Sequence, residues 1–64
     1  MPLTTAPNLD DPDGFYAELL AAHEGLDDAA QAALTARLVL ILANHVGDRA
    51  VLRAALALAR ETGA

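Results

Sequence analysis

The residues best suited to chemistry gather in one short segment near the middle of the chain. Asn44, His45, Asp48 and Arg49 form its densest polar cluster. Such a cluster suits a recognition corner, or a small ligand- or metal-binding site. It is also explained as a helix junction, in which Gly47 ends one helix and an aspartate caps the next. We favour the junction and keep as the alternative a small ligand- or metal-binding protein, or an enzyme, with its site at Asn44, His45 and Asp48.

Both histidines fall on apolar helix faces. A metal ion would need further ligands, for which Glu24 and Asp48 are the candidates. In an antiparallel hairpin, however, His23 and His45 lie at opposite ends of the second helix. The chain contains no cysteine and no serine, so it offers no thiolate ligand and no Ser or Cys nucleophile. We therefore expect no metal, no cofactor and no catalysis, and a His45 that is packed and hydrogen-bonded.

The arginines of the last helix share one face. Arg49, Arg53 and Arg60 flank Leu56 there and could hold a carboxylate, a phosphate or an acidic partner, although a solvated face is the ordinary interpretation. The last two helices resemble a helix-turn-helix only in outline. With a net charge of −5 and few base-reading side chains, nucleic-acid binding is not expected.

The charges are distributed unevenly along the chain. Residues 1–36 hold seven acids and no Lys or Arg, and residues 37–64 hold four arginines and two acids, so the two parts carry −7 and +2. This asymmetry would suit a basic partner surface or head-to-tail self-association. A solvated acidic face that keeps the protein soluble is the ordinary explanation, and we favour it.

Composition indicates an all-α fold. Hydrophobic residues make up 55% of the 64 positions and aromatics only 3%, and much of the apolar content is alanine and leucine. We expect a single helical domain over 1–64, with an extended arm at 1–10 and helices at about 12–24, 28–46 and 49–60. Phe15 and Tyr16 are expected to anchor its core.

Capping signals define the three-helix unit. Asp11, Asp27 and Asp48 are predicted N-caps, and Gly25 and Gly47 are predicted to end the preceding helices. Both turns are short and combine a glycine with an aspartate cap, which favours antiparallel neighbours.

The second half of the second helix is apolar over more than half of its circumference. A chain this short cannot easily bury so much surface, so we expect the fold to be completed by a homodimer or by a larger protein. The expected interaction surface comprises Leu38, Leu40, Ile41, Leu42, His45, Val46 and Leu56. The expected recognition corner beside it comprises Asn44, Asp48, Arg49 and Arg53.

No basic segment followed by an apolar core begins the sequence, so we expect no signal peptide. The longest uninterrupted apolar run is far shorter than the ~20 residues that span a bilayer. We therefore expect a cytoplasmic protein without a membrane partner.

Several segments resemble a family of short bacterial proteins known only as a domain of unknown function. They are Pro7-Asn8-Leu9, Asp13-Gly14-Phe15-Tyr16, Leu34-Thr35-Ala36-Arg37-Leu38 and, most specifically, Leu-Ala-Asn-His-x-Gly-Asp at 42–48. Members of that family are encoded beside flavin-dependent aromatic hydroxylases and other catabolic enzymes. The resemblance therefore implies a small accessory subunit of a bacterial metabolic enzyme. It assigns no role to any residue.

Overall fold

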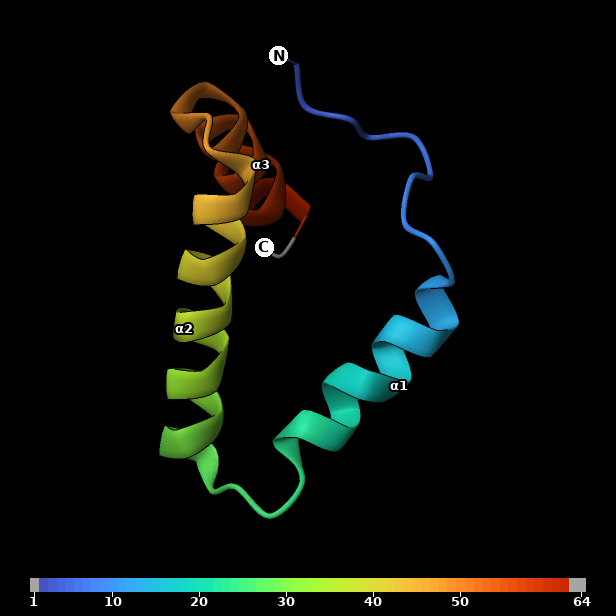
Figure 1. Cartoon of the computed structure of the whole chain (residues 1–64). Helices are drawn as coiled ribbons and strands as arrows, with labels where there is room; N and C mark the ends of the chain where they lie inside the picture. The colour runs from blue at the N-terminus through green and yellow to red at the C-terminus, as the bar shows by residue number, and fades with distance from the viewer. Residues whose placement is uncertain (1, 63–64) are drawn as a thin grey trace.

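The computed structural model describes residues 2–62 and contains three helices, α1 (Pro12–His23), α2 (Asp28–Val46) and α3 (Arg49–Thr62), with no strand in that range (Figure 1). The predicted all-α three-helix unit is confirmed. Its helix ends differ slightly from the expected ones, because α1 stops before Glu24 and α3 continues beyond Arg60. Residues 2–11, before α1, have no regular secondary structure.

Aspartates begin all three helices. Asp27 Oδ1 accepts a hydrogen bond from the amide of Ala30 at 2.9 Å. Asp48 Oδ1 accepts from Ala50 at 2.9 Å and from Val51 at 3.4 Å. The carboxylate of Asp11 likewise accepts from the Gly14 amide at 3.1 Å. Each side chain satisfies first-turn amides that have no partner within the helix.

Two glycines reverse the chain. Gly25 and Gly47 have φ angles of 78° and 75°, in the left-handed region that glycine enters without a Cβ penalty. The first turn is further tied by Gln31, whose Nε2 donates to the Leu26 carbonyl oxygen at 2.9 Å. At the second, the Gly47 amide donates to the carbonyl oxygen of Ala43 at 2.9 Å.

The helices do not enclose a core. α1 and α2 diverge from their turn as a V, while α3 packs against the C-terminal half of α2 (Figure 1). Val51, 8% exposed, is the only buried hydrophobic residue in the described part of the chain. The accessible surface is 5540 Å², whereas a compact 6.6 kDa monomer would expose about 3,900 Å². The radius of gyration, 13.3 Å, likewise exceeds the ~10.7 Å of a compact chain of this length.

Asp48→Ala is expected to lower the free energy of unfolding by about 1 kcal/mol, because two α3 amides lose their acceptor. Urea denaturation followed by far-UV circular dichroism measures this change. Asp48→Asn is the matched control and should retain most of the stability, since its amide oxygen can accept the same bonds. Equal losses in the two variants would contradict the capping role.

Candidate interaction surfaces

The exposed apolar residues of α2 are the main feature of the molecular surface. Leu40 and Ile41 are 70% and 64% exposed, and Val39, Leu42 and Val46 are also exposed. Of the expected interaction surface, only Leu38 is half-buried; Leu56 on α3 is exposed with the rest. Residues of a binding surface must be exposed in the free chain, as these are. Their assignment to an interaction surface stays a prediction.

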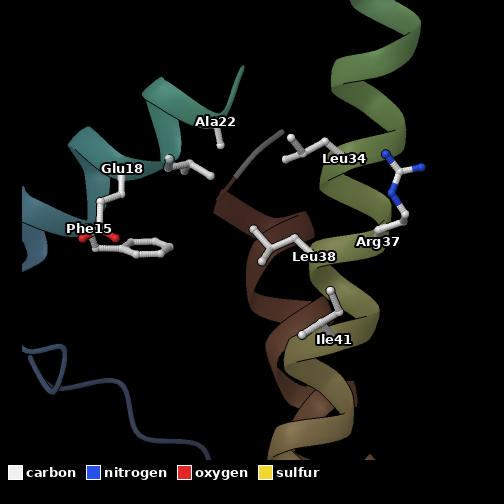
Figure 2. Close-up of a pocket in the computed structure, with 8 residues that line it drawn as sticks. Phe15, Glu18, Ala22, Leu34, Arg37, Leu38 and Ile41 are labelled. Carbon is white, nitrogen blue, oxygen red and sulfur yellow. The ribbon is translucent and has the colours of Figure 1, made fainter. Parts of the chain in front are cut away.

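A first groove, the hairpin groove, lies between α1 and α2 and has a volume of about 440 Å³. Figure 2 shows Phe15 and Ala22 projecting from α1 towards Leu34, Leu38 and Ile41 of α2. The groove is lined by Phe15, Glu18, Leu19, Ala22, Leu34, Arg37, Leu38 and Ile41.

A second groove, the α2–α3 groove, has a volume of about 400 Å³ and an entirely apolar set of lining residues. They are Val39, Leu40, Ala43, Leu52, Ala55, Leu56 and Ala59. At about 100° per residue, the α2 residues of the two grooves lie roughly 160° apart around the helix. α2 therefore presents apolar surface on two opposite faces.

Two charged side chains belong to the otherwise apolar hairpin groove. Glu18 comes from α1 and Arg37 from α2, and both are exposed. On a helical wheel each lies about 65° from the centre of its groove face. Because the helices are antiparallel, these offsets place both charges along the same edge of the groove. The 3.6-residue pattern of α1 alone puts Glu18 outside the apolar arc, and only the position of α2 shows that this side chain borders a groove.

The expected core anchors on α1 are not buried. Phe15 is 41% exposed and Tyr16 is 60% exposed. The prediction of an aromatic core is wrong, because α1 leans away from α2 and α3 and no other element covers it (Figure 1). Phe15 instead lines the hairpin groove.

The polar corner between α2 and α3 is a helix junction in this structure. Asn44, His45, Arg49 and Arg53 are exposed, and the Asp48 carboxylate caps α3. The expected packing of His45 is wrong: this side chain extends the Leu34–Leu38 face beyond the reach of α1 and is exposed in the described part of the chain. The packed histidine is His23, whose Nδ1–H donates to the Leu19 carbonyl oxygen at 2.7 Å in the matching tautomer.

Residues 2–62 contain no group of three or more His, Asp or Glu side chains arranged to hold a metal ion. The hypothesis of a ligand or metal site at Asn44, His45 and Asp48 thus stays a prediction that no observation here favours.

By length and composition, α2 could cross a membrane. Its 18-residue window has a mean hydropathy of 1.3 and none of it is buried. Core helices of soluble proteins can have the same length and composition. Arg37 lies in the middle of α2, and a charge at the bilayer centre costs roughly 2.5–3.5 kcal/mol on insertion scales. A protein partner that covers α2 but leaves the Arg37 guanidinium in water avoids this cost. The expected absence of a membrane partner stays a prediction.

The fold and its two grooves define a small all-α protein whose largest apolar surfaces lie outside any core. The chain belongs to the family described as "Protein of unknown function (DUF2783)", whose model matches residues 3–61. The family resemblance seen in the sequence is confirmed. No curated protein and no solved structure matches the chain.

Asn44→Ala and His45→Ala should each change the free energy of unfolding by less than about 0.5 kcal/mol, since both side chains are exposed. Gly47→Ala should lower the free energy of unfolding by about 1 kcal/mol or more, because φ at this position is 75°, which is unfavourable for alanine. The cost comes from the backbone and not from a clash, since the nearest atom to an added Cβ is 3.9 Å away. Urea denaturation of the three variants gives these values. A loss above 1 kcal/mol for His45→Ala would show that this side chain is packed.

Proposed function

We propose that this chain is a non-catalytic helical module that works by binding protein, and that it serves as a small accessory subunit of a metabolic enzyme. The observation that carries the proposal is the missing core: one hydrophobic residue of the described chain is buried, while large apolar side chains are exposed on all three helices. Apolar surface contributes roughly 25 cal/mol per Å² when it leaves water, so covering these helices supplies a strong driving force for association.

The α2–α3 groove suits a larger protein partner. Arg49, Arg53 and Arg60 lie within about 40° of one another on the helical wheel of α3, next to Leu56. Arginine pairs with carboxylates through a planar fork of donors. The matching partner surface is therefore an apolar projection, inserted beside Leu40 and Leu56, with carboxylates at its rim. Such a pattern gives both affinity and orientation.

The accessory role fits what the chain offers. Its polar side chains cap helices, tie turns or face solvent, and the surface that distinguishes it is apolar. The family resemblance implies that such chains are encoded beside flavin-dependent hydroxylases, so an enzyme of that kind is the first partner to test. We propose a cytoplasmic location for both proteins. In this role the chain would supply a helical surface, and the enzyme would supply the reactive groups.

The test is to tag the protein in its own host and identify by mass spectrometry what purifies with it. We expect one enzyme at fixed stoichiometry, and Leu56→Glu should reduce its recovery at least about tenfold, because a charge enters the centre of the interface.

Ala54→Glu is the matched control. It adds the same charge two positions earlier on α3, on the face away from both the α2–α3 groove and the arginines, and should leave recovery of the enzyme unchanged. Equal recovery with both variants would contradict the assigned surface. Recovery of a stoichiometric metal or small molecule with no protein partner would favour the ligand-binding alternative instead.

A further inference from the structure

We infer that the hairpin groove is a self-association site, closed by the same groove of a second copy. The two copies form a four-helix bundle of α1 and α2 from each chain, around a two-fold axis parallel to the helices, with both α1–α2 turns at the same end. This inference rests on the proposed function as a protein-binding module and names the occupant of one of its two grooves.

The spacing of the groove residues is that of a bundle core. Phe15, Leu19 and Ala22 stand at i, i+4 and i+7 on α1, and the same spacing recurs on α2. This is the a/d repeat that lines the core of a helical bundle.

The two repeats are also in register. In an antiparallel hairpin, Ala22 and Leu34 are level next to the turn, Leu19 and Leu38 are level in the middle, and Phe15 and Ile41 are level at the open end. One chain thus supplies two of the four residues in each of three core layers. A second chain with its turn at the same end completes each layer with the same pair of residues.

The exposed area is what a stable dimer needs. The chain exposes 5540 Å², about 1,600 Å² more than a compact monomer of its mass. Part of the excess belongs to residues 2–11 and to the α2–α3 groove. Stable homodimers bury from about 800 Å² to over 1,000 Å² on each partner. The excess area of the chain is larger than one partner's share of such an interface.

The charges of the groove favour a second copy. By their helical-wheel positions Glu18 and Arg37 lie along the same edge, and the residues that line this groove come from α1 and α2, not from α3. The two-fold axis places α1 of one copy against α2 of the other at the same level. Glu18 of each copy then faces Arg37 of the other, which makes the edge self-complementary, as an isologous interface requires.

Sedimentation velocity of the full chain across a concentration series measures the assembly. We expect a dimer that Ile41→Glu weakens on the order of a hundredfold, because two buried apolar positions gain a charge. Thr35→Glu adds the same charge to an exposed position of α2 outside both grooves, and the dimer should persist. Circular dichroism of the variants confirms that the helices remain.

Charge reversal tests the arrangement itself. Glu18→Arg alone and Arg37→Glu alone should each weaken the dimer on the order of tenfold, since both cross-pairs become repulsive. An equimolar mixture of the two variants should restore it, because in the mixed dimer each substituted side chain faces an opposite charge on the other copy. The repulsion within each chain is the same in the mixture, so restoration reports pairing between copies.

A wild-type chain that stays monomeric at all concentrations would overturn the inference. So would a dimer that Ile41→Glu leaves intact, or single variants whose mixture is no stronger than either alone. Each of these results leaves the α2–α3 groove and its enzyme partner untouched. Conversely, loss of enzyme capture with Leu56→Glu in a chain that still dimerises would separate the two surfaces.

Discussion

One constraint dominates the structure: α2 has apolar surface on two opposite faces, and the chain has only two shorter helices with which to cover it. α3 divides its apolar and polar residues between two faces, as a surface helix does, whereas α2 does not segregate them. The second half of α2 is apolar over more than half of its circumference, which is more than a surface helix usually exposes. α1 and α3 line one groove each, and both grooves remain open.

The turns explain why the chain does not cover α2 by folding more tightly. Gly25 and Gly47 fix the direction in which each helix leaves, and Asp27 and Asp48 begin the next helix within two residues. These local bonds are satisfied by the chain itself, so the ends of the helices are set without tertiary contacts. The connections then place α1 and α3 against different faces of α2, since α1 lines a groove with Leu34, Leu38 and Ile41 and α3 lines one with Val39, Leu40 and Ala43.

Sequence patterns predicted the elements well because the signals are local. An aspartate cap, a glycine in the left-handed region and an apolar period act within about one helical turn. Burial depends on how far apart the helices lie, and that distance is set by tertiary packing. Phe15 and His45 were therefore expected inside on correct helical faces, yet both are exposed. Glu18 was missed as a groove residue for the same reason, since its relation to Arg37 exists only once α1 and α2 are placed.

A chain without a core cannot separate its stability from its binding. Val51 and a few half-buried leucines offer little apolar burial to offset the ordering of three helices. A partner that binds only the folded form adds stability in proportion to the logarithm of its concentration. In the proposed assembly folding and association would be one equilibrium, and the apolar faces of α2 would lie in an interior that two or more chains build together.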